Sequence, residues 1–264
     1  MDKVQVNGTE IAYESRGEGE PLLMIHGAGV PHGEFQPQYD ALGAKFRLIL
    51  PDVRGHGESP VTQVPYSMKL FADDMIGLLD VLKIDRTLIL GHSMGGTIAQ
   101  QMAVDHPNRV KAMVLAETNY GIKSTPWLYW TVRAMDPLSR MIGIKRLSGM
   151  SVKQFSARSP GMKPFLEAAF QQHIDDPANF WNISQANNEF DGKDKLPNIQ
   201  CPTLVMAARN NPQSHRFAHY MAEHIPNARL IMVSNAGHML NWDNAEVFNK
   251  SVIEFFENVG SYGS

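Results

Sequence analysis

The segment GHSMG at 91–95 constrains the fold of this chain more than any other, because two different patterns flank it. The apolar run at 87–92 indicates a buried strand, and the run at 96–106 has the pattern of a helix. A serine at a sharp turn between a strand and a helix, with glycine on both sides, is typical of a nucleophile elbow. The glycines let the two elements pass closely, and the strained turn exposes the hydroxyl. We therefore predict that Ser93 is a nucleophile.

A serine hydroxyl is a weak nucleophile until a base takes its proton, so a histidine is needed near the end of a later strand. His238 meets this need, because it follows an apolar run at 230–233 and a turn that contains Gly237. A helix is expected after it. This is the position of the general base in chains that place serine, acid and histidine in that order. We predict that His238 is the base.

The reaction also needs two donors for the oxyanion that forms when the serine attacks a carbonyl carbon. One is the backbone N–H of Met94, at the N-terminus of the predicted helix, where the helix dipole favours an anion. The other is expected in the loop after the apolar run at 22–25, where the N–H of Ala28 is directed at the same point. We expect the preceding His26 to orient this loop and not to act as a base.

Several segments together carry a resemblance that covers nearly the whole chain. They are HGAG at 26–29, DVRGHGES at 52–59, GHSMGG at 91–96, HPNRV at 106–110 and NAGHM at 235–239. In this order and spacing they resemble the α/β-hydrolases of the serine esterase and lactonase group. The resemblance implies a mostly parallel eight-stranded sheet with helices on both faces and a helical cap inserted after the sixth strand. It says much less about the substrate, since one fold supports many chemistries.

The acid is the position at which the chain departs from the family pattern. The usual acid follows the seventh strand, but here Asn210 and Asn211 precede Pro212. An amide can orient an imidazole but cannot stabilise the imidazolium that forms during catalysis. In a minority of the family the acid instead ends the sixth strand, and aligning HPNRV places Glu117 there. We predict Glu117 as the acid. Two alternatives stay open: Glu117 faces solvent, or Asn211 acts alone or stands where an aspartate belongs.

The alternation of strands and helices stops in the middle of the chain. We expect a core domain formed by 1–119 and 196–264, and a helical cap or lid at 120–195 that is rich in Met, Trp and Phe. Most of these side chains are expected to form the small core of the cap. Others face the cleft, and we expect Trp127 and Trp181 to bind substrate. Because substrate pockets are largely apolar, a hydrophobic ester or lactone is favoured over a charged or sugar substrate.

Composition restricts the partners. The net charge is −3 and no run of basic residues is present, so no nucleic-acid partner is expected. No apolar stretch is long enough for a membrane span or a signal peptide. The single cysteine, Cys201, excludes an intramolecular disulfide and fits a cytoplasmic protein. We expect no cofactor and no metal, and the sequence leaves a homodimer open.

Together these observations predict a serine hydrolase that cleaves a carboxylic ester or lactone with a hydrophobic moiety through an acyl-enzyme. Within the same fold, the alternatives are a C–C bond hydrolase and a cofactor-free perhydrolase. An alternative from another class is a ligand receptor with slow hydrolysis. The polar cluster of Asp52, Arg54 and His56 resembles a catalytic group, but we expect it to have a structural role in a tight loop.

Overall fold

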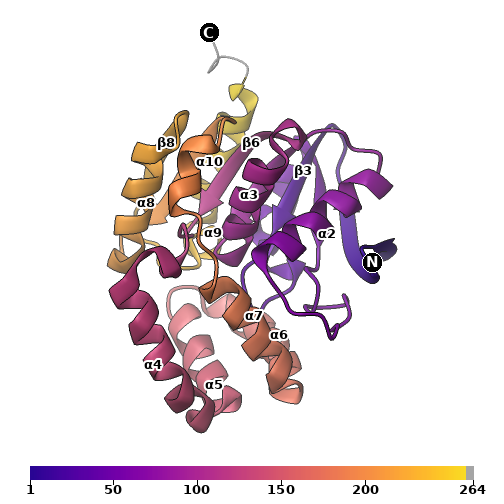
Figure 1. Ribbon diagram of the computed structural model, residues 1–264. Coiled ribbons are helices and arrows are strands. Elements are labelled where there is room, and N and C mark those ends of the chain that lie inside the picture. The colour runs from indigo at the N-terminus through magenta and orange to yellow at the C-terminus, as the bar shows by residue number, and fades with distance from the viewer. Residues whose placement is uncertain (260–264) are drawn as a thin grey trace.

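The computed structural model describes residues 1–259, and its centre is one eight-stranded sheet (Figure 1). The strands are β1 Asp2–Val6, β2 Thr9–Arg16, β3 Glu20–Ile25, β4 Phe46–Pro51, β5 Thr87–His92, β6 Val110–Ala116, β7 Thr203–Ala208 and β8 Ala228–Val233. Their order in the sheet is β1-β2-β4-β3-β5-β6-β7-β8. β2 runs antiparallel to β1 and β4, and all the other pairs are parallel. The α/β-hydrolase fold expected from the sequence is therefore confirmed.

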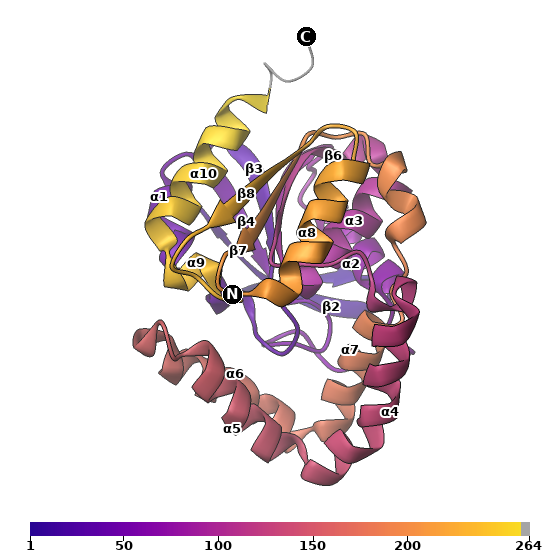
Figure 2. The same cartoon turned by 90° about the vertical axis from the view of Figure 1, so that its left-hand side faces the viewer.

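Helices cover both faces of the sheet. Outside the segment between β6 and β7 they are η1 His32–Gln38, α1 Tyr39–Gly43, α2 Met68–Val81, α3 Met94–Asp105, η2 Pro107–Arg109, α8 Pro212–His224, α9 Leu240–Asp243 and α10 Ala245–Glu257. α2, α3 and α8 share one apolar core with one face of the sheet, and α1 and α10 share a second core with the other face (Figure 2). The central strands are buried on both faces, as their continuous apolar runs predict.

Between β6 and β7 the chain is helical and lies beyond the carboxyl ends of the parallel strands (Figures 1 and 2). The elements are η3 Ile122–Ser124, α4 Pro126–Ile142, α5 Ile144–Phe155, η4 Pro160–Met162, α6 Lys163–Asp175, α7 Pro177–Asn188 and η5 Lys193–Asn198. Local sequence sets their limits: Asp176 caps the N-terminus of α7 by accepting from the Asn179 N–H, and Gly143, with φ 82°, ends α4. We call this segment the cap. The boundaries of the two domains stay a prediction.

The parallel register brings several strand ends to one edge of the sheet. The paired residues near this edge are Ile25 with Gly91, His92 with Ala116, Ala116 with Met206 and Ala208 with Val233. The loops that carry Ala28, Ser93, Glu117, Asn211 and His238 each follow one of these strands. The topology therefore places all five beneath the cap, at the edge where α/β sheets bind their ligands.

Candidate active site

Ser93 occupies the turn between β5 and α3 in a strained conformation, with φ 52° and ψ −117°. The two neighbouring glycines explain how the turn is possible. A Cβ atom on Gly91 would overlap the carbonyl oxygen of Gly95, and one on Gly95 would overlap the carbonyl oxygen of Ile25. Strand and helix therefore pass at a distance that only glycine allows, which is the crowding that the GHSMG pattern predicts.

The loop after β3 lies against this turn. Its Gly27 N–H donates to Oε2 of Glu34 at 2.8 Å, whereas no loop or turn carbonyl within residues 1–259 accepts from the N–H of Ala28 or Met94. The oxyanion-binding role of the two N–H groups stays a prediction, and the lack of such an acceptor among the described residues is compatible with it. His26 has no ring nitrogen left for base catalysis, because Nε2 accepts from the Val53 N–H at 2.9 Å and Nδ1 donates to the Gly27 carbonyl at 2.8 Å. This agrees with an orienting role for His26.

The structure brings Glu117 next to His238. Oε2 of Glu117 lies 3.4 Å from Nδ1 of His238, the ring nitrogen that a triad acid contacts. This is a long hydrogen bond, and catalytic hydrogen bonds are often long in enzymes without substrate. The side chain of Glu117 is fully buried, while that of His238 is 29% exposed. The solvent-facing alternative for Glu117 is therefore wrong.

Three further donors surround the carboxylate. Oε1 accepts from the Ala208 N–H at 2.6 Å and from the Ser214 hydroxyl at 2.9 Å, and Oε2 accepts from the side-chain amide of Asn211 at 2.5 Å. Burial alone raises the pKa of Glu117, but the hydrogen bond and charge of His238, together with these donors, outweigh burial and lower it. Glu117 is thus ionised at neutral pH, and Asn211 binds the carboxylate instead of replacing it.

A second carboxylate and histidine pair lies behind the nucleophile, and sequence analysis missed it. Oε1 of Glu34 is 2.6 Å from Nδ1 of His92, in a buried ion pair whose atoms are poorly aligned for a hydrogen bond. Burial alone raises the pKa of Glu34, but the interaction with His92 outweighs burial and lowers this pKa. Burial alone lowers the pKa of His92, but the interaction with Glu34 outweighs burial and raises that pKa. Nε2 of His92 donates to the carbonyl of His238 at 2.8 Å. The pair therefore joins the Gly27 loop, the Ser93 turn and the segment of the base.

No sequence motif identifies Glu34 as the partner of His92, because the two residues are more than fifty positions apart. Its surroundings extend the connection: the carbonyl of Glu34 accepts from the Trp242 indole at 2.7 Å and from the Asn241 amide at 3.0 Å. Both donors belong to α9, directly after the loop of His238. The sequence signal that could have indicated this pair is His92, because it lies within the GHSMG segment next to Ser93.

The outer side of His238 opens into a cavity of about 470 Å³. Phe155 and Arg158, from the end of α5 and just beyond it, line this cavity together with Asn211 and Asp243. The ring of Phe155 lies 5.5 Å from the ring of His238. A mixed apolar cluster around Val30, Val152, Phe170 and Met239 joins the cap to the loops of the site. Thus some cap side chains face the catalytic edge and others pack against it.

A family model for the alpha/beta hydrolase fold matches residues 20–245. The chain belongs to this family. It is 30% identical to the 2-hydroxy-6-oxononadienedioate/2-hydroxy-6-oxononatrienedioate hydrolase 2 of Pseudomonas putida, over 94% of this chain and 92% of that protein. It is 27% identical to the serine hydrolase BPHL of Mus musculus, over 97% and 86%. Among solved structures, Est816, described as an N-acyl homoserine lactone degrading enzyme, superposes with a TM-score of 0.82 at 28% identity, over 96% and 100%.

In this α/β-hydrolase the two tryptophans expected to bind substrate both belong to the cap. Trp127 is 63% exposed on α4. Trp181, on α7, lies beneath the guanidinium of Arg140 at 4.8 Å and lines a separate cavity of about 290 Å³ between α4 and α7. Neither lines the cavity beside His238. A contact of either one with substrate stays a prediction, and Phe155 is the aromatic residue that the structure places beside the base.

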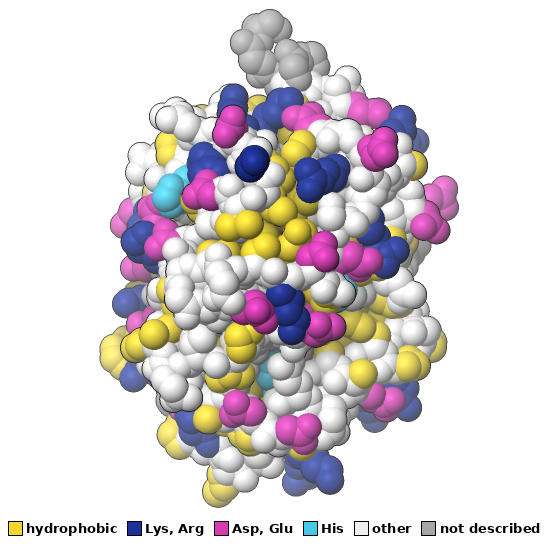
Figure 3. Space-filling view, turned by 90° about the vertical axis from the view of Figure 1, so that its right-hand side faces the viewer, with side chains coloured by type: hydrophobic (Ala, Val, Ile, Leu, Met, Phe, Trp, Pro, Cys, Tyr) yellow, Lys and Arg dark blue, Asp and Glu magenta, His cyan; other side chains and the backbone are white. Residues whose placement is uncertain are grey.

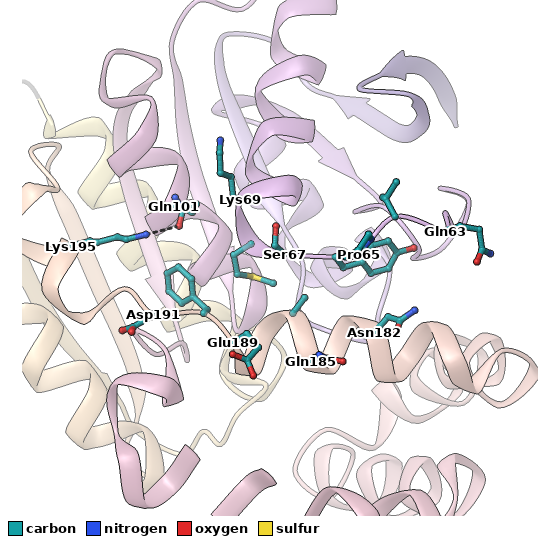
Figure 4. A pocket seen from close by; sticks show the side chains of 15 residues that line it. Gln63, Pro65, Ser67, Lys69, Gln101, Asn182, Gln185, Glu189, Asp191 and Lys195 are labelled. Carbon is teal, nitrogen blue, oxygen red and sulfur yellow. Dashed lines mark hydrogen bonds between the residues drawn. The ribbon is translucent and has the colours of Figure 1, made fainter. Parts of the chain in front are cut away.

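Another cavity, of about 520 Å³, lies between the segment at 63–69 and α7 (Figure 4). Lys195 donates to the side chain of Gln101 at its edge, at 3.4 Å. Neither Ser93 nor His238 lines it. His238 lines the cavity beside Phe155, whereas Ser93 is among the lining residues of neither cavity.

The polar cluster at 52–59 has local partners. Asp52 accepts from the backbone N–H groups of His32 and Glu58, both at 2.8 Å, and Arg54 forms a buried ion pair with Asp74 at 2.7 Å. These bonds support the structural role expected for the loop. In the described part of the chain, no group of three or more His, Cys, Asp and Glu side chains is placed to hold a metal ion. Nor is any helix within residues 1–259 long and apolar enough to cross a membrane.

Proposed function

We propose that this α/β-hydrolase is a serine hydrolase that cleaves a carboxylic ester or lactone with a hydrophobic moiety. The observation that carries the proposal is the buried Glu117 carboxylate against Nδ1 of His238, at the same sheet edge as the strained Ser93. A carboxylate in this position selects the tautomer in which Nε2 is free to accept a proton. The charge of Glu117 is fully buried and lies against a partly exposed imidazole, which supports a role in orienting that imidazole.

The proposed reaction proceeds through an acyl-enzyme. Ser93 Oγ attacks the carbonyl carbon while Nε2 of His238 takes its proton, and the N–H groups of Ala28 and Met94 stabilise the oxyanion. The tetrahedral intermediate collapses as His238 returns the proton to the leaving alcohol oxygen. Water then attacks the acyl group by the same path in reverse, with Glu117 compensating the imidazolium in both halves. These steps require no cofactor.

We assign positioning roles to Glu34 and His92. Glu34 fixes the Gly27 N–H, and with it the next N–H, that of Ala28. His92 fixes the carbonyl of His238. Because the two side chains form one ion pair, the distance between the oxyanion loop and the base depends on it. The pair acts through other residues and does not touch the reacting atoms.

A few apolar side chains near His238 support a hydrophobic acyl or alcohol group, while the rest of the cavity lining is largely polar and includes Arg158 and Asp243. Phe155 flanks the base, and Val30 and Met239 belong to the apolar cluster beneath the cap. The relative that degrades N-acyl homoserine lactones is consistent with this class. The 30% identical relative is a hydrolase of 2-hydroxy-6-oxo dienedioates, which keeps the C–C bond hydrolase as the second candidate.

The test is turnover of p-nitrophenyl esters of increasing chain length, beside a lactone panel and a 2-hydroxy-6-oxo dienoate. We expect many cycles per enzyme on esters or lactones, complete loss in Ser93→Ala, and labelling of Ser93 by a fluorophosphonate. A single burst without turnover would support the slow receptor. Faster loss of the dienoate than of any ester would support C–C hydrolysis, and acceleration by hydrogen peroxide at the expense of hydrolysis would support a perhydrolase. Activity retained in Ser93→Ala would refute the nucleophile.

A further inference from the structure

The longest cap helix, α4, presents its apolar side to solvent. None of its residues is buried. The exposed apolar residues of α4 are Trp127, Trp130, Met135, Leu138, Met141 and Ile142. At 100° per residue they fall on one side of the helix, which we call the apolar face of α4. Trp130 is 65% exposed and Met141 is 79% exposed.

The opposite side of α4 is the one that contacts the protein, and its contacts are largely polar. The Tyr129 hydroxyl donates to Glu189 at 2.8 Å, and Arg133 forms an ion pair with the same carboxylate at 3.0 Å. Asp136 and Arg140 form another ion pair at 2.8 Å and line the cavity between α4 and α7. An amphipathic helix normally buries its apolar face. Here the Asp136–Arg140 pair lies within α4, the contacts with Glu189 lie on its polar side, and the apolar face is exposed.

Charge identifies the partner. The segment 121–158, which contains α4 and α5, has seven basic side chains and one acidic side chain, a net charge of +6. The basic residues are Lys123, Arg133, Arg140, Lys145, Arg146, Lys153 and Arg158. The other 226 residues carry seventeen basic and twenty-six acidic side chains, a net charge of −9. By contrast, on the face drawn in Figure 3 basic and acidic side chains are interspersed.

Two of these basic residues, Lys145 and Arg146, lie next to the apolar face at the tip of the cap. The turn between α4 and α5 is at the end of the molecule farthest from the C-terminus (Figures 1 and 2). Met141 and Ile142 lie just before this turn, and Lys145 and Arg146 just after it. Among the ion pairs of residues 1–259, none involves Lys145 or Arg146. A helix that lies in a membrane interface typically exposes Trp, Met and Leu next to basic side chains without ion-pair partners.

We propose that the α4–α5 segment of the cap docks on an anionic lipid surface. The apolar face of α4 enters the boundary between headgroups and acyl chains, and Lys145 and Arg146 bind the anionic headgroups. A second copy of this chain fits less well, because a symmetric contact through α4 brings two segments of net charge +6 together. The proposal assigns Trp127 to lipid and not to substrate, and it does not depend on which bond the enzyme cleaves.

The experiment is cosedimentation of the full chain with vesicles of phosphatidylcholine alone or with about one-third phosphatidylserine. We expect binding to the anionic vesicles only. Trp130→Ser and Met141→Ser should each weaken it about tenfold, the loss of one inserted apolar side chain. Lys145→Gln should weaken it about fivefold, the contribution of one cation near the surface. All three side chains are solvent-exposed, so unchanged melting temperature and ester turnover will show that the fold is intact.

Matched controls come from outside the cap. Val81→Ser removes an exposed apolar side chain of α2, and Lys250→Gln removes an exposed cation of α10; both should bind vesicles like the wild type. Absence of wild-type binding overturns the proposal, as does binding that Trp130→Ser and Met141→Ser leave unchanged. A dimer in light scattering that Trp130→Ser dissociates, without vesicle binding, would identify a second copy as the partner instead.

Discussion

Replacing Glu117 by glutamine tests the proposed triad most directly, because it removes the charge while keeping the shape of the side chain. All the atoms that face the carboxylate are donors: the Ala208 N–H and the Ser214 hydroxyl at Oε1, and the Asn211 amide and His238 Nδ1 at Oε2. A glutamine must turn its NH₂ group toward one of these two sets. If it faces His238, the imidazole adopts the wrong tautomer, and if it faces Ala208, a buried N–H loses its acceptor.

Either orientation removes the charge that compensates the imidazolium. We expect kcat to fall by about 10⁴-fold, the effect of neutralising a triad carboxylate, which corresponds to about 5 kcal/mol in activation free energy. The loss of an acceptor for a buried donor adds about 1–3 kcal/mol of destabilisation. The assay is kcat at saturating p-nitrophenyl butyrate, with a thermal melt of each variant.

Asn211 supplies the matched control. Asn211→Ala removes one hydrogen bond to Glu117, about 1 kcal/mol, so kcat should change by less than about tenfold. Asn211→Asp in the wild type should lower kcat, because two carboxylates then share one site, and in the Glu117→Gln background it should recover part of the lost rate. A Glu117→Gln enzyme within tenfold of the wild type, or a single Asn211→Asp variant that is faster, would refute the assignment.

Other perturbations test the rest of the site. Gly95→Ala should destabilise the protein by on the order of 3 kcal/mol, since its Cβ would overlap the Ile25 carbonyl, whereas Gly149→Ala, with open space around it in α5, should not; chemical denaturation measures both. Phe155→Ala should lower kcat/KM for p-nitrophenyl octanoate more than for the acetate, and equal losses would assign Phe155 to packing alone. Glu34→Gln should lower kcat with little change in KM, and an unchanged kcat would contradict the positioning role. Burial holds the pKa of His56 well below its ordinary value, so the unfolded state binds more protons and the free energy of unfolding should fall as the pH drops below about 6.5. His92 has a raised pKa and contributes the opposite dependence of the free energy of unfolding on pH. The wild type is therefore compared with His56→Asn, and equal slopes of the free energy of unfolding in melts from pH 7.5 to 5.5 would contradict the role of His56.

The parts of the fold that sequence predicted well are those with strong local signals. The strand expected at 87–92 is found at Thr87–His92, and the sixth strand, expected to end near Glu117, is found at Val110–Ala116. Both are buried on two faces and carry continuous apolar runs. Helix α2 begins at Met68 because Ser67 caps it. The short α1 and α9 escaped prediction, since four or five residues carry too little periodicity to be recognised.

The cap shows a second feature that the sequence could not predict, namely the direction in which the apolar face of a helix points. Its richness in Met, Trp and Phe predicted an apolar interior, but α4 turns that composition outward. The periodicity of an amphipathic helix gives the width of its apolar face and not the direction in which that face points. The direction depends on tertiary contacts, such as the Tyr129 hydrogen bond and the Arg133 ion pair with Glu189, which join residues more than fifty positions apart. Trp127 was therefore identifiable as part of an apolar face, but its exposure was not.

The predicted acid shows that the residue after one strand restricts the residue that can follow the neighbouring strand. A carboxylate at 117 favours an uncharged donor at 211. Glu117 directly follows β6. The Ala208 N–H at the end of β7 and the Asn211 amide in the loop after it, where the family usually has its acid, both donate to the Glu117 carboxylate. A carboxylate at 211 would meet that of Glu117 at hydrogen-bond distance, and two such groups cannot both be ionised at neutral pH. An amide at 211 is therefore what a carboxylate at 117 requires. The hydrogen bond between Asn211 and Glu117 couples the two positions, and this coupling is consistent with the prediction that the acid follows the sixth strand.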